Sequence, residues 1–185
     1  MTINTGILGG DPKKAKKIIL AIIDAAGKTF TGKTRLYKAF YAAHLFHFNN
    51  QPGLLSQHRI VHMPRGPAID EGDILIESLV KEGRITVLKK MDGPYPEYMF
   101  TIVGEADAID DGEMQSVREA VAWIGNRTAK ELSDITHRAS WDETDNGEEM
   151  NIYADLIDPE EYDAIKQRQQ AIKRELDGIQ SAEQC

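Results

Sequence analysis

Apolar residues recur every three to four positions in several stretches of the chain, the spacing that gathers them on one face of an α-helix. The first stretch begins after Asp11 and Pro12, which suit a helix N-cap and a first helical turn, and it stops at Gly27. A second stretch, over residues 34–48, is apolar on two faces and is predicted as the central buried helix. Further helices are predicted at residues 70–82, between Asp111 and Gly125, and from Thr128 onward.

An alternation of apolar and polar residues, typical of half-buried strands, marks the middle of the chain. Residues 85–87 and 100–102 show it, and they are predicted to face each other in a β-hairpin across a long loop that contains two prolines. Residues 59–62 predict another short strand, which ends before a rigid corner at Gly66 and Pro67. The expected fold class is therefore α+β and predominantly helical, with about six helices and a small antiparallel hairpin.

The composition is that of an ordinary globular protein of one domain, with 185 residues, 41% of them hydrophobic and 28% charged. We expect a flexible arm at residues 1–10, the main domain at residues 11–157, and a last helix at residues 158–185 that serves as an edge or assembly element. The sequence has no apolar run of about 18 residues and no signal-peptide core, so it predicts neither a membrane span nor export. The single cysteine, Cys185, has no partner within the chain, which suits the cytoplasm.

The net charge of −8 repels phosphate backbones overall, so nucleic-acid binding would need a local basic face. Residues 11–103 predict three helices followed by a hairpin, an order that a winged-helix-like nucleic-acid-binding regulator would use. Basic residues do concentrate near the first two helices, namely Lys13, Lys14, Lys16, Lys17, Lys28, Lys33 and Arg35. Residues 70–82 are acidic, however, so DNA is an alternative partner that is not favoured, and a basic protein partner suits the chain better.

Residues 27–34, with the sequence Gly-Lys-Thr-Phe-Thr-Gly-Lys-Thr, match the pattern of a phosphate-binding P-loop. In a P-loop, backbone N–H groups would cradle a nucleoside triphosphate and Lys33 would neutralise its outer phosphates. The motif needs a buried strand before it, yet the residues before Gly27 predict a capped helix, and no alternating strands and helices follow. We therefore interpret this segment as a turn that caps the following helix, and nucleotide binding is a lesser alternative.

No catalytic, cofactor-binding or metal-binding residue is predicted. The candidates for a metal site are His44, His47, His58 and His62. Zinc needs three or four converging ligands, and a histidine on an apolar helix more often hydrogen-bonds inside the core. Residues 133–137 contain serine, aspartate and histidine, but one short helix does not place a nucleophile and a base around a substrate carbonyl. We therefore expect a protein that is not an enzyme.

Three segments of moderate specificity follow one another along the chain. They are Leu-Tyr-Lys-Ala-Phe-Tyr-Ala at residues 36–42, Arg-Gly-Pro at 65–67 with a helix after it that ends near Gly83, and Leu-Ser-Asp-Ile-Thr-His at 132–137 with Trp141 beyond. In this order the segments resemble the Panacea domain, the family of SocA-like antitoxins and phage-associated proteins. The chain departs from the family pattern at Arg65, where an aromatic residue is usual, and at Ser140, where a proline usually precedes the tryptophan.

The resemblance implies an antitoxin that binds and neutralises a separately encoded protein toxin, either by masking the toxin or as an adaptor that delivers it to a protease. It implies nine domain-signature or partner-binding residues, the signature residues, which are Leu36, Lys38, Tyr41, Arg65, Gly66, Pro67, Thr136, His137 and Trp141. We expect His137 to hydrogen-bond across to another segment and Trp141 to pack over the core. Candidate partner contacts are Arg65, the hairpin loop around Tyr95 and Tyr98, and the exposed side of residues 136–141.

Overall fold

The structure is a computed structural model that describes residues 10–91, 93–157, 160, 167–168 and 170–174. Its helices are α1 (Pro12–Ala25), α2 (Lys33–Asn50), α3 (Gly72–Lys81), α4 (Asp111–Ile124), α5 (Ala129–Thr136), α6 (Ala139–Asp142) and the 3₁₀ helix η1 (Ile152–Leu156). Its strands are β1 (Thr29–Thr31), β2 (Ile60–Met63), β3 (Gly66–Ile69), β4 (Ile85–Met91) and β5 (Pro96–Ile102). The fold is α+β and predominantly helical, as predicted. The expected arm at residues 1–10 and the helix at residues 158–185 lie mostly outside the described residues.

Polar side chains fix where three of the helices begin, and the sequence predicts each of these starts. Asp11 caps α1 by accepting a hydrogen bond from the backbone of the first turn. Asp110 and Glu113 form a capping box at α4, and Thr128 and Glu131 form another at α5. These bonds satisfy backbone N–H groups that a helix leaves unpaired.

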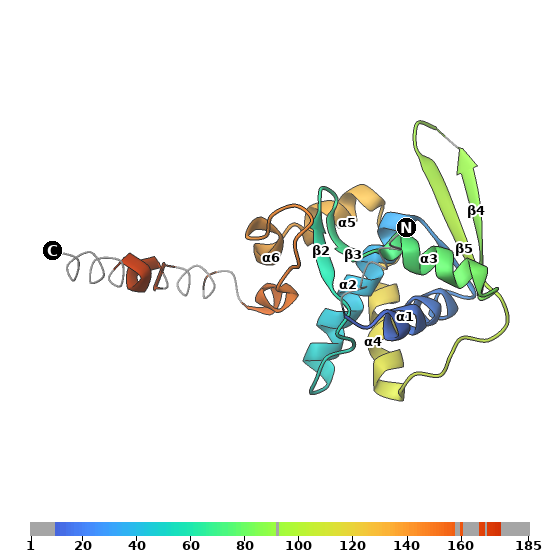
Figure 1. The fold of residues 1–185 in the computed structure, drawn as a ribbon, viewed down its shortest axis with the longest axis horizontal. Helices are drawn as coiled ribbons and strands as arrows, with labels where there is room; N and C mark the ends of the chain where they lie inside the picture. Colours follow the sequence, from blue (N-terminus) through green and yellow to red (C-terminus); the bar gives the residue numbers. More distant parts are fainter. Residues whose placement is uncertain (1–9, 92, 158–159, 161–166, 169, 175–185) are drawn as a thin grey trace, which may run out of the picture.

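Helix α2 is the centre of the fold, as its two apolar faces predict. Residues 38–44 are buried without exception, and α2 contacts α1, α4, α5 and β3 (Figure 1). Helix α1 is buried on every face over residues 18–23. Because most of the other helices and both sheets contact α2, a side chain on α2 can connect distant parts of the sequence.

The larger sheet is antiparallel with the strand order β1-β5-β4. The sequence predicts the β4–β5 hairpin but expects a long loop, whereas the strands extend to Met91 and Pro96 and leave a short connection. Exposed cross-strand pairs such as Lys90 and Glu97 continue the ladder beyond the buried residues, and Figure 1 shows the hairpin projecting past the helices. Strand β1 is not predicted, because three residues are too few for an alternation to show.

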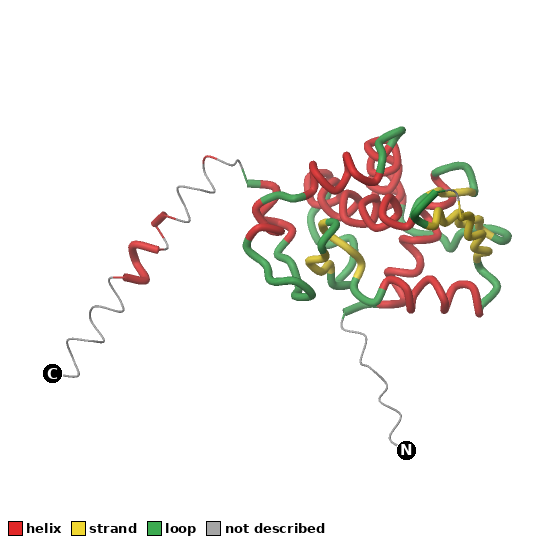
Figure 2. Tube along the Cα trace, turned by 90° about the horizontal axis from the view of Figure 1, so that it is seen from above, coloured by secondary structure: helices red, strands yellow, loops and turns green. Residues whose placement is uncertain are grey.

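The smaller sheet, β2 with β3, corrects the expectation of a rigid corner at Gly66 and Pro67. The turn is formed by Pro64 and Arg65, and Gly66–Ile69 is a fully buried strand. Gly66 has a φ of 90°, which glycine adopts easily, and it starts the strand directly after the turn. Glycine and proline usually signal turns, so the sequence pattern hides this strand. Figure 2 shows the two sheets in separate places among the helices.

Candidate functional site

Six of the nine signature residues meet where α2, the β2–β3 hairpin and the α5–α6 region join. They are Lys38, Gly66, Pro67, Thr136, His137 and Trp141. Lys38 lies at their centre with 1% of its surface exposed, and its Nζ donates a hydrogen bond of 2.7 Å to the Pro67 carbonyl oxygen. Burial lowers the pKa of Lys38 to about 7, because the amine has left water and no carboxylate in the described residues offsets the loss.

Gly66 allows the close approach that this cluster requires. A Cβ atom at this position would lie 2.6 Å from Lys38 Nζ and 2.8 Å from Thr136 Oγ1. Both distances are too short for any side chain, so the backbone of β3 itself forms one wall around the amine. The glycine at the start of the Gly66–Pro67 step thus allows strand β3 to lie close against helix α2.

His137 and Trp141 are stacked, with ring centroids 3.9 Å apart and planes inclined by 10°. Trp141 packs against the core as expected, and its Nε1 donates a hydrogen bond of 3.0 Å to the Met63 carbonyl oxygen. The expectation that His137 hydrogen-bonds across to another segment is wrong, because its Nε2 is buried without a partner among the described residues. Burial, followed by the nearby charge of Lys38, lowers the pKa of His137.

The remaining signature residues lie elsewhere. Leu36 is fully buried in the core, and the Tyr41 hydroxyl donates a hydrogen bond of 2.7 Å to Asp155. Arg65 is exposed in the β2–β3 turn, where its guanidinium lies 5.5 Å from the centre of the Tyr95 ring. Two of the candidate partner contacts, Arg65 and Tyr95, are therefore neighbours on the surface although 30 residues separate them in the sequence.

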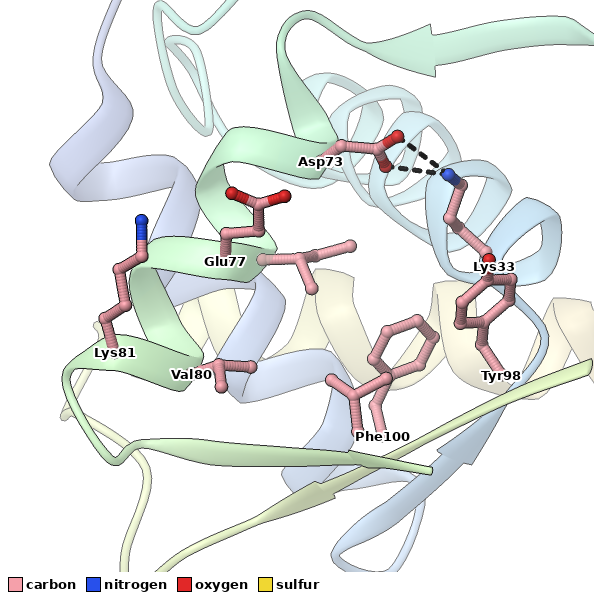
Figure 3. Close-up of a pocket in the computed structure, with 9 residues that line it drawn as sticks. Lys33, Asp73, Glu77, Val80, Lys81, Tyr98 and Phe100 are labelled. Atoms are coloured by element: carbon pink, nitrogen blue, oxygen red, sulfur yellow. Dashed lines mark hydrogen bonds and ion pairs between the residues drawn. The ribbon is translucent and has the colours of Figure 1, made fainter. Parts of the chain in front are cut away.

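A hollow of about 390 Å³ opens between α3 and the inner face of the larger sheet, and we call it the α3 pocket (Figure 3). Its apolar lining consists of Ile76, Val80, Val87, Tyr98 and Phe100. Phe100 is 1% exposed and Val80 is 43% exposed, so the pocket reaches from the core to the surface. Its size falls within the range of pockets that hold ligands or partner side chains, roughly 300 to 1,000 Å³.

An ion pair closes one end of the α3 pocket. Lys33 Nζ lies 2.8 Å from each carboxylate oxygen of Asp73 (Figure 3). The Tyr37 hydroxyl donates a hydrogen bond of 2.6 Å to the same carboxylate. Partial burial acts to raise the pKa of Asp73, but the hydrogen bonds from Lys33 and Tyr37 outweigh it and lower the pKa overall. Glu77 and Lys81 also line the pocket and have no such partner in the described part of the chain.

The segment that matches the P-loop pattern has a different structure. Thr29–Thr31 is strand β1, paired with β5, and the N–H of Gly32 donates to the carbonyl oxygen of Tyr98. Lys33, the residue that would neutralise phosphates, is held by Asp73. Backbone groups that a P-loop would point at a nucleotide are therefore used within the sheet.

The histidines considered for a metal site are each hydrogen-bonded to protein groups. His44 is 2% exposed and bonds the Phe40 carbonyl and Ser56 Oγ, which confirms its expected core role, and burial lowers its pKa to about 4. The other three bond separate groups: His47 to Ser116, His58 to the Asp70 carbonyl and His62 to the Thr144 carbonyl. Among the residues that the structure describes, no group of three or more potential ligands is placed to hold a metal ion.

The sequence signals neither Asp155 nor the α3 pocket. Asp155 is 2% exposed and accepts hydrogen bonds of 2.7 Å from the Tyr41 hydroxyl, 2.6 Å from Ser140 Oγ and 2.9 Å from the Ser140 backbone. Its partners lie 114 and 15 residues away, so no local motif marks it. The pocket is likewise assembled from the start of α2, one face of α3 and the hairpin.

Comparison with known proteins finds no matching family model, no similar curated protein and no similar solved structure. The Panacea resemblance therefore stays a prediction from the sequence. None of the helices within the described ranges is long and apolar enough to cross a bilayer.

Proposed function

We propose that the protein is an antitoxin-like binding protein, which neutralises a separately encoded protein toxin by holding part of it in the α3 pocket. The observation that carries this proposal is the apolar hollow between α3 and the larger sheet, open to solvent and edged with charged side chains. The order of the signature segments in the sequence supports the same function.

The chemistry of the α3 pocket supports binding rather than catalysis. Its lining contains no serine, cysteine or histidine, and two of its four charged side chains, Lys33 and Asp73, are paired with each other. The exposed side chain of Val80 beside the buried ring of Phe100 is a surface that accepts an apolar side chain from a partner. Glu77 and Lys81 provide charges that would orient such a partner.

The first experiment is co-expression of this chain with the gene adjacent to its own, scoring growth and then co-purification. The neighbour alone is expected to arrest growth, and this chain is expected to restore growth while forming a complex. A constant amount of neighbour protein during rescue would indicate masking, and a falling amount would indicate delivery to a protease. A harmless neighbour that does not co-purify would contradict the proposal.

Two valines of similar exposure give a matched pair of variants. Val80, 43% exposed, lines the α3 pocket, whereas Val103, 48% exposed, follows β5 and does not line it. Val80→Glu is expected to abolish rescue and complex formation, because it places a charge where an apolar side chain would bind. Val103→Glu is expected to leave both intact. Equal effects of the two variants would exclude the pocket as the binding site.

One observation favours a nucleic-acid-binding regulator as a second candidate. The order α1-β1-α2-α3-β4-β5, with β1 paired to β5, is the connectivity of a winged helix, interrupted here by the β2–β3 hairpin.

The charges weigh against this second candidate. Lys14, Lys16, Lys28 and Lys33, which belong to the basic group at the first two helices, are paired with Glu113, Glu82, Asp24 and Asp73. Positive charge that acidic side chains already neutralise attracts phosphates less. Fluorescence anisotropy with DNA from upstream of the gene tests this candidate. Sequence-preferring binding that falls steeply with salt would support it over the antitoxin function.

A further inference from the structure

Strand β4 is an edge of the larger sheet, and no other described strand pairs with its outer side. The strand order places it at the end, and its seven residues pair one to one with β5 without a bulge. It contains no proline, and Leu88 and Met91 are 48% and 69% exposed. Long, regular edge strands with exposed apolar residues tend to pair with another chain, and proteins usually shorten, bend or cover them or place lysines on them. Of these features β4 has the lysines, Lys89 and Lys90.

The register identifies which backbone groups face outward. The Val103 N–H donates to the Arg84 carbonyl oxygen, so this pair is a hydrogen-bonded one. Hydrogen-bonded pairs alternate in antiparallel ladders, so residues 86, 88 and 90 bond β5. The N–H and C=O groups of Ile85, Val87 and Lys89 therefore point away from β5, toward the free edge.

The α3 pocket lies beside this edge. Val87 belongs both to the outward-bonding positions of β4 and to the lining of the pocket. A strand added along β4 would send every second side chain to the same face as Val87 and Phe100, beneath α3. Backbone bonding and an apolar pocket for alternate side chains are together the features of recognition by strand addition.

The charges near the hairpin tip indicate the chemistry of the added strand. Lys89 and Lys90 are both exposed on β4, and Lys81 lines the pocket without a partner in the described part of the chain. These three lysines outnumber the two carboxylates near them, Glu97 opposite Lys90 and Glu77 in the pocket lining, so this edge is slightly basic on a chain whose net charge is −8. Carboxylates on the incoming segment would complement it.

We propose that β4 binds an extended segment of a partner protein as an additional strand, with apolar side chains at alternate positions entering the α3 pocket and carboxylates meeting Lys89 and Lys90. This inference rests on the proposed function, since it specifies the chemistry of the segment that the toxin presents. It also makes a separate claim about the edge, which a synthetic peptide can test without the toxin.

The test uses the full chain labelled with nitrogen-15 and the peptide acetyl-Val-Glu-Phe-Glu-Val-Glu-Glu-amide as the probe. At millimolar peptide, the amide signals of Ile85, Val87 and Lys89 are expected to shift and their hydrogen exchange to slow by about tenfold. The rearranged peptide acetyl-Val-Phe-Val-Glu-Glu-Glu-Glu-amide has the same composition without the alternation and is expected to bind much more weakly. Absence of a shift, or equal binding of both peptides, would overturn the proposal.

Two variants at one position separate backbone pairing from charge. Lys89→Pro removes an N–H that points to the free edge, a position where an edge strand tolerates proline, and is expected to abolish peptide binding. Lys89→Thr keeps the N–H and is expected to weaken binding by only a few fold, about the effect of one exposed charge pair. If Lys89→Pro does not fold, the comparison of the two peptides on the unaltered chain still tests whether β4 binds an added strand.

The outcomes distinguish this inference from the proposed function. Peptide binding at β4 without any rescue of growth would leave the edge site standing and reject the antitoxin function. Rescue of growth without peptide binding, unaffected by Lys89→Pro, would support the antitoxin function and reject the edge site. Slow exchange at β4 before peptide is added, together with a dimeric mass in solution, would show that a second copy occupies the edge and would overturn the proposed partner segment.

Discussion

The Nζ atom of Lys38 lies 2.7 Å from the carbonyl oxygen of Pro67 in the interior of the protein, with no carboxylate beside it in the described residues. One neutral acceptor does not offset the cost of removing an ammonium group from water, so the amine loses its proton near pH 7. The amine and the ammonium both carry N–H donors, so the bond between α2 and β3 persists in either state. What changes with pH is the free energy of folding.

Lys38→Met should remove a specific pH dependence of stability. The unfolded chain holds the Lys38 proton up to about pH 10.5, whereas the folded chain releases it near pH 7. The folded state binds fewer protons between these values, so Lys38 makes the free energy of unfolding rise with pH there, by at most about 1.4 kcal/mol per pH unit. Urea unfolding at pH 7, 8 and 9 measures this slope.

Lys130→Met is the control for this experiment, because Lys130 is exposed on α5. It should retain the slope of the unaltered protein, while Lys38→Met should lose most of it. Identical slopes for the two variants would show that the Lys38 amine is not the source of the pH dependence.

Gly66→Ala should destabilise the protein by about 3 kcal/mol, since it combines a strained positive φ with close contacts. The new methyl group would meet Lys38 Nζ at 2.6 Å and Thr136 Oγ1 at 2.8 Å. Gly53→Ala is the matched control, because Gly53 has a φ of 104° but no atom within 4 Å of the added methyl. The control should cost only the backbone strain, about 1 to 2 kcal/mol. Thermal unfolding compares the two, and equal losses would mean that the contacts around Gly66 contribute nothing.

Asp155→Ala should cost about 3 kcal/mol, because it leaves the Tyr41 hydroxyl and the Ser140 backbone without their acceptor in a buried site. Tyr41→Phe removes only the hydroxyl of one pair and should cost less. Combining the two substitutions should give less than the sum of their separate losses, since the residues share one hydrogen-bond network. Chemical denaturation of the single and double variants measures this coupling. Strict additivity would argue against a shared network.

ATP and GTP should not bind the unaltered protein, even with magnesium present. The segment at residues 27–34 uses its backbone in strand β1, and Lys33 is paired with Asp73. Isothermal titration calorimetry with each nucleotide checks this expectation. Binding that disappears in a folded Lys33→Ala variant would instead restore the P-loop interpretation.

Capping residues and apolar periodicity are local signals, so the sequence predicts α1, α2, α3 and α4 with nearly correct ends and α5 with a nearly correct start. Strands β1 and β3 escape prediction because one is too short and the other begins with glycine and proline. Grouping Lys38 with Gly66 and His137 depends on the family resemblance rather than on any local pattern, although that resemblance does not reveal the stacking of His137 on Trp141. The α3 pocket depends on how three separate segments pack, which no periodicity encodes.

The buried hydrogen bonds of Asp155 hold the end of the described domain in place. They join η1 to α2 and α6 only a few residues before the chain continues into the region from residue 158 onward. Because all three hydrogen bonds are accepted by the one carboxylate of Asp155, displacing this side chain breaks them together. Residues 152–157 should therefore detach as a unit in rare openings of the native state, exposing Tyr41 and giving a protease a place to begin degrading the chain.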